Sequence, residues 1–297
     1  MSDTPTLGAL LATARRRLKD AAIDTADIDA RLLLEAATGA SRLDLLAAAD
    51  RAVAPGAADR LLGWLDRRAA GEPIGRILGV ASFYGLDFIL GPDTLEPRPD
   101  TETLVEVALA AVRDGRIAGV SPRGEGLRFL DLGTGTGAIA VTLLAKLPGA
   151  RGMATDLSPG ALAVAKDNAD RNGVGDRLDF AQGDFFAAVT GSFNLIVSNP
   201  PYIASTVIAD LDREVRLHDP LLALDGGPDG LAAYRTIVGG VHDHLAPGGL
   251  LAVEIGWDQG EAVDTLFRAS GLVEVEVHRD LGSRQRVVSG RRSAQFD

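Results

Sequence analysis

The stretch Phe129-Leu-Asp-Leu-Gly-Thr-Gly-Thr-Gly-Ala138 decides the fold of this 297-residue chain. A short apolar strand runs into three alternating glycines, whose backbone can turn tightly and approach a ligand closely. Asp156 ends the next expected strand, nineteen positions after Gly137. A carboxylate at that place can accept hydrogen bonds from both hydroxyls of a ribose. Together the two features predict a site for a nucleoside-containing cofactor rather than a purely structural glycine turn.

Outward from this stretch, apolar strands alternate with helical segments, which predicts an α/β fold with a doubly wound, mostly parallel, seven-stranded sheet. The expected strands are Leu127–Leu132, Gly152–Asp156, Leu178–Gln182, Leu195–Ser198, Leu250–Ile255, Val273–Val277 and Arg286–Ser289. The expected helices between them are Ala138–Lys146, Pro159–Asn172, Leu231–Leu245 and Gln259–Ala269. Because only Asp280–Arg284 joins the last two strands, a final antiparallel hairpin is expected.

The N-terminal part has a different pattern. Apolar residues recur at three- and four-residue steps, which predicts a bundle of about four short helices over residues 1–75, the third capped by Ser41. Residues 76–100 then read as a β-hairpin over Ile77–Leu90 and a proline-rich linker. The third predicted domain covers residues 101–297, and its first helix, Glu102–Val112, is expected to be capped by Asp100 or Thr101.

Composition excludes several classes of function. The chain has no cysteine and only four histidines, none in a zinc-binding pattern, so we expect no metal site. The net charge of −11 disfavours general nucleic-acid binding. No apolar run is long enough for a membrane span, and the positive charges follow the first apolar segment, the reverse of a secretory signal. A cytoplasmic protein is expected.

A second motif, Ser198-Asn-Pro-Pro-Tyr-Ile203, follows the expected fourth strand. Two successive prolines hold the backbone in a fixed conformation, and a proline has no N–H to donate. The Asn199 side-chain oxygen and the Pro200 carbonyl can therefore accept both hydrogens of an incoming –NH₂ group. Tyr202 offers a flat face for a planar amide or base. The motif predicts a site for a planar, nitrogen-bearing substrate.

Two cofactor classes fit the glycines. The spacing from Gly133 to Ala138 also satisfies the dinucleotide fingerprint, so a nicotinamide oxidoreductase stays an alternative. Asp131 opposes it, because a carboxylate there would face a pyrophosphate, whereas it suits a cationic amino-acid cofactor. The sequence resembles the class I methyltransferases that use S-adenosylmethionine, in which this acid-rich glycine loop holds the methionine part.

Asn-Pro-Pro-Tyr in this place is similar to the motif of methyltransferases that act on exocyclic nitrogens, either adenine N6 in DNA or RNA or a glutamine amide in protein. Further segments resemble the release factor glutamine methyltransferases across essentially the whole chain. These segments are Asp29-Ala-Arg-Leu-Leu-Leu34, Gly71-Glu-Pro-Ile-Gly-Arg-Ile-Leu-Gly79, Phe83-Tyr-Gly-Leu-Asp-Phe88, Pro97-Arg-Pro-Asp-Thr-Glu102 and Leu251-Ala-Val-Glu-Ile-Gly-Trp-Asp-Gln-Gly260. An adenine-N6 methyltransferase stays as the alternative that the net charge disfavours.

The resemblance implies transfer of a methyl group from S-adenosylmethionine to the glutamine amide of the Gly-Gly-Gln motif in class 1 peptide chain release factors. Composition and charge leave no direct nucleic-acid, membrane or metal partner expected. Because every cofactor-type motif lies after residue 127, we expect the N-terminal domain to dock the substrate. The implied cofactor-binding residues are Asp131, Gly133, Thr134, Gly135, Thr136, Gly137, Asp156, Asp184, Phe185 and Asn199, with Phe185 beside the adenine. The implied catalytic and substrate-binding residues are Asn199, Pro200, Pro201 and Tyr202.

Overall fold

A computed structural model describes residues 4–294, which form two compact units. The first unit comprises the chain up to Gly79 together with Asp212–His218, and the second comprises Val80–Leu211 and the chain from Asp219 onward. The chain therefore leaves the second unit after Leu211, contributes one short helix to the first, and returns. No helix among residues 4–294 combines the length and apolarity that a membrane crossing requires.

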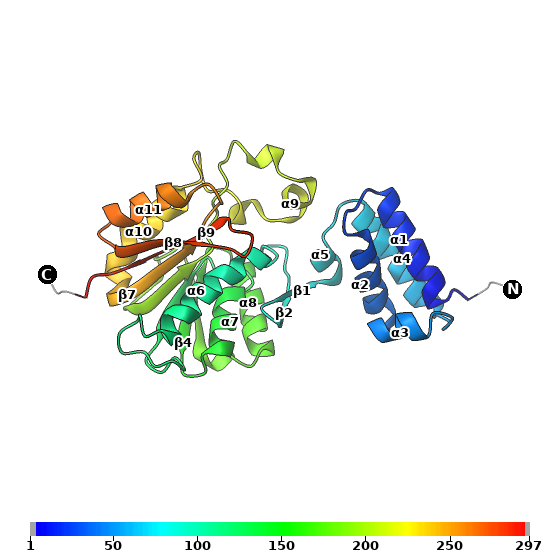
Figure 1. Ribbon diagram of the computed structural model, residues 1–297, viewed down its shortest axis with the longest axis horizontal. Helices are drawn as coiled ribbons and strands as arrows, with labels where there is room; N and C mark the ends of the chain where they lie inside the picture. The colour runs from blue at the N-terminus through cyan, green and yellow to red at the C-terminus, as the bar shows by residue number, and fades with distance from the viewer. Residues whose placement is uncertain (1–3, 295–297) are drawn as a thin grey trace. The chain divides into compact units, whose positions relative to one another are not determined.

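The first unit is a helical bundle, coloured blue to cyan in Figure 1 up to Gly79 and yellow-green over Asp212–His218. Its helices are α1 (Leu7–Asp20), α2 (Ala26–Thr38), α3 (Arg42–Ala47), α4 (Pro55–Ala69), α5 (Ile74–Leu78) and α9 (Arg213–His218). Leucine and alanine side chains from α1, α2 and α4 fill its core. Ser41 caps α3 as predicted: its hydroxyl accepts a hydrogen bond from the Asp44 N–H, and the Asp44 carboxylate accepts one from the Ser41 N–H.

A buried ion pair lies inside this bundle. Nε of Arg68 on α4 donates to Asp29 on α2 at 2.7 Å, and both side chains are buried. The other end of the Arg68 guanidinium donates to Glu214 on α9 at 3.1 Å. Removing Arg68 or Asp29 would leave a buried charge without compensation. The Glu214 carboxylate is 42% exposed and gives α9 an ion-pair contact with α4.

The second unit contains the predicted seven-stranded sheet, in the order β5-β4-β3-β6-β7-β9-β8. The first five of these strands run parallel, and β9 is antiparallel to both β7 and β8. The strands are β3 (Arg128–Leu132), β4 (Arg151–Asp156), β5 (Leu178–Gln182), β6 (Phe193–Ser198), β7 (Leu245–Glu254), β8 (Val273–Arg279) and β9 (Gln285–Arg291). The doubly wound fold and the final hairpin are therefore as the sequence predicts.

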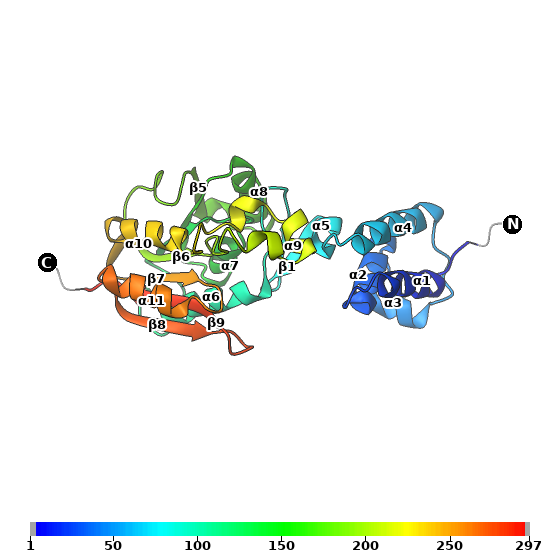
Figure 2. The ribbon, with the colours of Figure 1, turned by 90° about the horizontal axis from the view of Figure 1, so that it is seen from above.

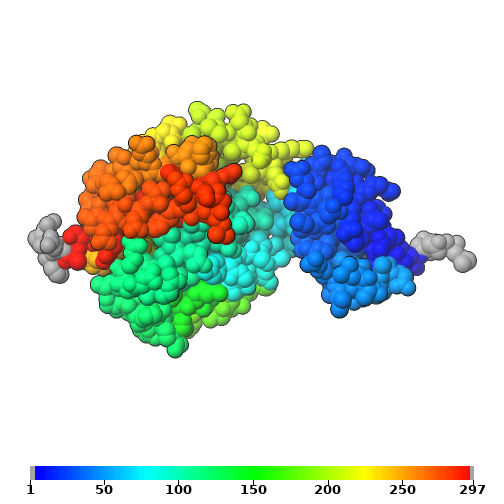
Figure 3. Space-filling view, in the orientation of Figure 1, coloured from blue at the N-terminus to red at the C-terminus, as the bar shows by residue number. Residues whose placement is uncertain are grey.

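Helices cover both faces of this sheet (Figures 1 and 2). On one face lie α6 (Glu102–Arg113), α7 (Ala138–Lys146) and α8 (Pro159–Arg171), and on the other α10 (Ala232–His244) and α11 (Gly260–Ala269). Two apolar clusters of buried side chains separate the helices from the strands, one cluster on each face. The β8–β9 hairpin packs beside α11, orange to red in Figure 3. The strand ends at the carboxyl edge are thus left free to build a site.

Short elements precede the sheet in the chain and connect some of its strands and helices. A two-stranded antiparallel hairpin is formed by β1 (Val80–Phe83) and β2 (Leu86–Ile89). The 3-10 turns are η1 (Pro99–Thr101), η2 (Gly175–Arg177), η3 (Ile208–Asp210) and η4 (Leu221–Ala223). The turn η1 leads directly into α6, so the proline-rich linker ends in a helical turn that the sequence had not indicated.

Several sequence predictions of local structure are wrong. Ile77 and Leu78 belong to α5 and not to the hairpin, because Gly79 ends that helix in the left-handed conformation. Strand β7 begins at Leu245 and not at the predicted Leu250. Its pairing with β6 shifts register between Phe193 and Leu195, and this irregularity accommodates Pro247-Gly-Gly249 within the strand. Thr101, one of the two predicted caps, is the N-cap residue of α6, but its side chain makes no capping hydrogen bond.

Candidate active site

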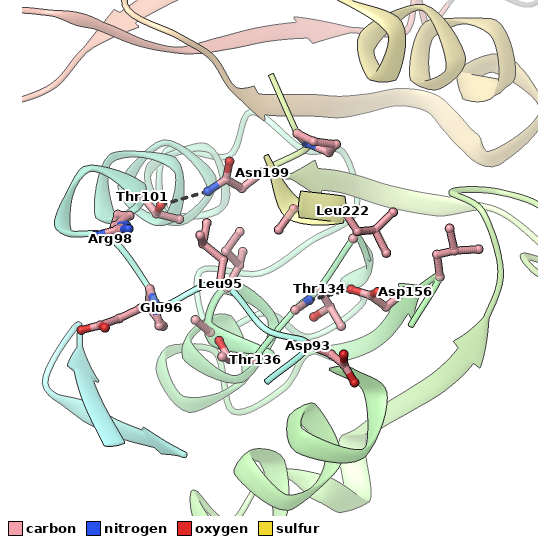
Figure 4. A pocket seen from close by; sticks show the side chains of 18 of the residues that line it. Asp93, Leu95, Glu96, Arg98, Thr101, Thr134, Thr136, Asp156, Asn199 and Leu222 are labelled. Atoms are coloured by element: carbon pink, nitrogen blue, oxygen red, sulfur yellow. Dashed lines mark hydrogen bonds between the residues drawn. The ribbon is translucent and has the colours of Figure 1, made fainter. Parts of the chain in front are cut away.

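A cavity of about 1020 Å³, including its mouth open to solvent, lies at the carboxyl ends of β3, β4 and β6 (Figure 4). This is the place where doubly wound sheets bind ligands. Every residue that lines the cavity belongs to the second unit. The predicted site residues among the lining are Gly133, Thr134, Gly135, Thr136, Asp156, Asp184, Phe185, Asn199 and Pro201. Most of the predicted site is therefore brought together.

The glycine loop has the backbone that its sequence predicts. Gly133 and Gly135 have φ angles of +70° and +56°, and a Cβ on either would meet nothing within 4 Å. Because both residues line the cavity, their missing side chains leave the loop backbone open to a ligand. Gly137 serves a different purpose, since a Cβ there would lie 3.1 Å from the Cβ of Ala165 on α8. The loop thus presents open backbone to the cavity at Gly133 and Gly135, and it packs closely against α8 at Gly137.

Asp131 is fully buried beneath this loop and is not among the residues that line the cavity. Its Oδ2 accepts a hydrogen bond from the Thr134 hydroxyl at 2.7 Å, and its Oδ1 has no partner within residues 4–294. Burial raises the pKa of Asp131 to about 7, although the Thr134 hydrogen bond opposes the shift. The structure therefore places this carboxyl where it holds the loop, and direct cofactor contact stays a prediction.

Asp156 lies at the end of β4 and lines the cavity. Its Oδ2 accepts from the Gly135 N–H at 2.9 Å, and its Oδ1 accepts from the Ser158 N–H at 2.9 Å. Burial raises its pKa, and the backbone N–H groups that donate to it oppose that shift. Each carboxylate oxygen keeps a further lone pair, so the group can still accept hydrogen bonds from two hydroxyls of a ligand.

Asp184 and Phe185 follow β5 and border the same cavity. Phe185 has a φ of +45°, which is uncommon for a residue with a side chain. Its carbonyl accepts a hydrogen bond from the Thr155 hydroxyl at 3.2 Å. This backbone conformation sets a half-buried aromatic ring at the cavity wall, as a flat ligand such as adenine needs.

The Asn-Pro-Pro-Tyr segment leaves β6 at the cavity edge, where Asn199 and Pro201 form part of the lining. Pro200 is buried, and Tyr202 is half-buried and packs against an apolar cluster. Burial, together with the nearby Glu254, raises the pKa of Tyr202 to about 12. The Tyr202 carbonyl accepts a hydrogen bond from Nε2 of Gln259 at 3.0 Å. The hydrogen bond from Gln259 and the packing of Tyr202 therefore hold the loop in place. The stacking role of Tyr202 stays a prediction.

The lining carries four carboxyl side chains and one guanidinium, which are Asp93, Glu96, Asp156, Asp184 and Arg98. Arg98 is paired with Asp219 at 2.6 Å. Such a surface favours a cationic ligand and repels a pyrophosphate or a phosphate backbone. S-adenosylmethionine carries a sulfonium and an ammonium group, so the residues present fit it. The same charge balance weighs against the nicotinamide alternative.

Sequence reasoning missed several residues of the site. Asp93, Leu222 and Thr101 line the cavity, and Gln259 and Glu254 lie behind the Asn-Pro-Pro-Tyr loop. Gln259 and Glu254 occur in a segment that carries the family resemblance, but nothing in their spacing indicated a role. Among residues 4–294 there is no group of three or more histidine, cysteine, aspartate or glutamate side chains that could hold a metal ion.

Comparison with solved structures supports the fold. The chain is similar to a methyltransferase from Pyrococcus furiosus, with a TM-score of 0.51 and 18% identity, over 77% of this chain and 97% of that chain. It is also similar to the hMettl16 catalytic domain, with a TM-score of 0.54 and 18% identity, over 81% and 82% of the two chains. At these identities the likeness concerns the fold alone. A family profile described as "Methyltransferase small domain" matches residues 120–213. The fold and its glycine loop are those of a Rossmann-like methyltransferase.

Sequence comparison gives the family. A profile described as "PrmC N-terminal domain" matches residues 9–79. The release factor glutamine methyltransferase of Cereibacter sphaeroides is 49% identical over 95% of this chain and 96% of its own length. Those of Rhodospirillum rubrum and Agrobacterium fabrum are 47% and 44% identical, each over 97% of this chain, and over 86% and 98% of their own lengths. The chain belongs to the release factor glutamine methyltransferase family.

Proposed function

We propose that this enzyme transfers a methyl group from S-adenosylmethionine to the side-chain amide nitrogen of the Gly-Gly-Gln glutamine in class 1 peptide chain release factors. The names and full-length similarity of the relatives support the reaction and the substrate. The observation that carries the proposal is the position of Asn199, at the wall of the same cavity as the glycine loop and Asp156. An amide held at Asn199 would thus share one cavity with the cofactor. A cytoplasmic location remains a prediction.

The cavity divides into residues for the cofactor and residues for the amide. The open backbone of the glycine loop would receive the methionine part, the Asp156 carboxylate would accept the ribose hydroxyls, and Phe185 would border the adenine. When bound, the cofactor supplies an electrophilic methyl group on a sulfonium. Thr134 and Asp131 hold the loop from below through their 2.7 Å hydrogen bond.

The residues of the Asn-Pro-Pro-Tyr loop would position the amide. The Asn199 oxygen and the Pro200 carbonyl would each accept one hydrogen of the glutamine –NH₂, which leaves the nitrogen aimed along the direction of transfer. An amide nitrogen is a weak nucleophile, because its lone pair is delocalised into the carbonyl. Fixed orientation can supply several kcal/mol of the barrier. The methylated nitrogen becomes strongly acidic and loses its proton without a dedicated base.

Docking of the protein substrate would come from surfaces outside the cofactor residues. Leu221 and Leu222 are exposed, and Leu222 also lines the cavity, so an apolar rim borders the site. In the first unit, Leu43 and Leu46 on α3 are 72% and 78% exposed. Exposed apolar side chains that form a contiguous patch are a mark of protein contact. We propose that the first unit docks the release factor, because all the cofactor-type motifs lie in the second.

Methyl transfer from labelled S-adenosylmethionine to an intact class 1 release factor, with duplex DNA and RNA in parallel reactions, tests this proposal. Label is expected in the release factor and in neither nucleic acid. A release factor whose Gly-Gly-Gln glutamine is replaced by alanine is the matched control and should take up no label. Label in adenine would instead support the alternative that shares the Asn-Pro-Pro-Tyr motif.

A further inference from the structure

A threonine at the start of α6 contacts the amide that is proposed to bind the substrate. Nδ2 of Asn199 donates a hydrogen bond to Oγ1 of Thr101 at 3.2 Å (Figure 4). Thr101 is buried, and its side chain makes no cap for its own helix. A threonine in this position ordinarily caps the helix with its hydroxyl. Because Thr101 makes no such cap, its hydroxyl is available for another contact.

Glu254 is the third member of this chain of contacts. The parallel register pairs Ser198 of β6 with Val253 of β7, so Asn199 and Glu254 leave the sheet side by side at its carboxyl edge. Glu254 is 1% exposed, and the Thr101 hydroxyl lies close enough to its carboxyl to lower the pKa of that group. Its Oε2 has no hydrogen-bond partner within residues 4–294. Burying a carboxyl with so few hydrogen-bond partners costs free energy of folding, which indicates that Glu254 has a function.

The polarity of these hydrogen bonds determines which way the Asn199 amide faces. An ionised carboxylate can only accept, so the single hydroxyl hydrogen of Thr101 is drawn toward Glu254. Oγ1 of Thr101 is then left as an acceptor toward Asn199, and only the –NH₂ end of that amide can satisfy it. The Asn199 oxygen consequently lies on the side away from Thr101 (Figure 4). In the reversed orientation the Asn199 oxygen would face Oγ1 of Thr101, which is also an acceptor. The Asn199 –NH₂ would then face the substrate –NH₂, which is also a donor.

We propose that Thr101 and Glu254 are positioning residues, which fix the Asn199 amide with its oxygen free to accept a hydrogen from the substrate. This inference rests on the proposed function, since it assigns Asn199 the task of holding a glutamine amide. Neither residue needs to touch the substrate or the cofactor for this purpose. They act through the orientation of Asn199.

The charge state of Glu254 adds a second consequence. The groups that interact with it electrostatically are Thr101, Arg286, Asp100, Tyr202 and Tyr234. Burial raises the pKa of Glu254 to about 7, with Thr101 and Arg286 lowering it and Asp100 raising it. A protonated Glu254 becomes a donor to Oγ1 of Thr101, whose own hydrogen is then released toward Asn199. That reversal favours the wrong amide orientation, so turnover should decline as the pH falls below about 7.

The first test compares Thr101→Val with the wild type on intact release factor. Val keeps the shape of threonine and removes the acceptor, so kcat should fall by about 10- to 100-fold while the affinity for S-adenosylhomocysteine stays unchanged. Thr101→Ser restores the hydroxyl and should recover most of the activity. The matched control is Thr142→Val, because Thr142 on α7 is also buried and its hydroxyl has no partner within residues 4–294. The control should keep wild-type kcat.

The second test is the pH profile of kcat in the wild type and in Glu254→Gln. The wild type should show an acid limb near pH 7, and the variant, which has no proton to gain, should lose that limb. If the wild type methylates release factor and Thr101→Val does so at the same kcat, or if the acid limb is unchanged in Glu254→Gln, the positioning role is wrong. If the wild type itself transfers no methyl group to release factor, the proposed function fails instead. Binding of S-adenosylhomocysteine by each variant shows that it is folded.

Discussion

Replacing Asp156 by alanine should weaken cofactor binding more than it affects turnover at saturating cofactor. The Asp156 carboxylate lines the cavity and is held at fixed angles by the N–H groups of Gly135 and Ser158, each at 2.9 Å. In the proposed complex its remaining lone pairs accept the ribose hydroxyls. A hydrogen bond to a charged group contributes about 1.5–3 kcal/mol. Because about 1.4 kcal/mol corresponds to a tenfold change, the Kd for S-adenosylhomocysteine should rise by about 10- to 150-fold.

Isothermal titration with S-adenosylhomocysteine measures this change directly. Asp179→Ala is a suitable control, because Asp179 is an exposed aspartate on the neighbouring strand β5 and does not line the cavity. Its Kd should equal that of the wild type. The Asp156→Ala variant also loses the acceptor for two backbone N–H groups, so thermal unfolding is followed in parallel to measure the cost to the fold. An unchanged Kd in Asp156→Ala would mean that Asp156 only holds the glycine loop and that the ribose assignment is wrong.

Three further outcomes are expected. Asn199→Ala should lower kcat by an amount equivalent to about 2–4 kcal/mol, by analogy with the loss of an oxyanion-hole donor, and should leave S-adenosylhomocysteine affinity nearly intact in titrations; wild-type turnover would refute its role. The pKa of Asp131, raised to about 7 from 3.8, means that its contribution to stability is present below about pH 4 and is lost as the pH rises through about 7. The melting temperature of Asp131→Asn relative to wild type should therefore increase over that window, whereas a difference independent of pH would contradict the shift. Leu43→Ser with Leu46→Ser should raise the KM for intact release factor without changing S-adenosylhomocysteine affinity, and an unchanged KM would exclude α3 from docking.

The fold was predictable where the signal is local. Glycines at alternate positions after a short apolar strand, and an aspartate at the end of the next strand, depend on only a few neighbouring residues. The structure accordingly has Gly133 and Gly135 in the backbone conformation that only glycine adopts readily. It also has Asp156 at the end of β4, the strand beside β3, as predicted. The same holds for Ser41, whose cap depends on a residue three positions away.

The rest depends on contacts between distant parts of the chain. Thr101 meets Asn199 across 98 positions, and the sequence around Thr101 indicates only the start of a helix. Glu254 reaches the same place through the register of β6 with β7, which hydrophobic pattern does not specify for buried parallel strands. Helix α9 joins the first unit through Glu214 and the buried Arg68. A short charged helix has no pattern that would indicate such a partner.

The central claim, that the site presents a glutamine amide to S-adenosylmethionine, is tested most directly by locating the transferred methyl group. After reaction of the wild-type enzyme with intact class 1 release factor, tandem mass spectrometry of the peptide that contains Gly-Gly-Gln identifies the modified atom. A single added methyl group on the side-chain nitrogen of that glutamine is expected, and much less of this product should form with Asn199→Ala in the same time. A methyl group on another residue, or an unmodified glutamine beside methylated adenine in added nucleic acid, would contradict the central claim.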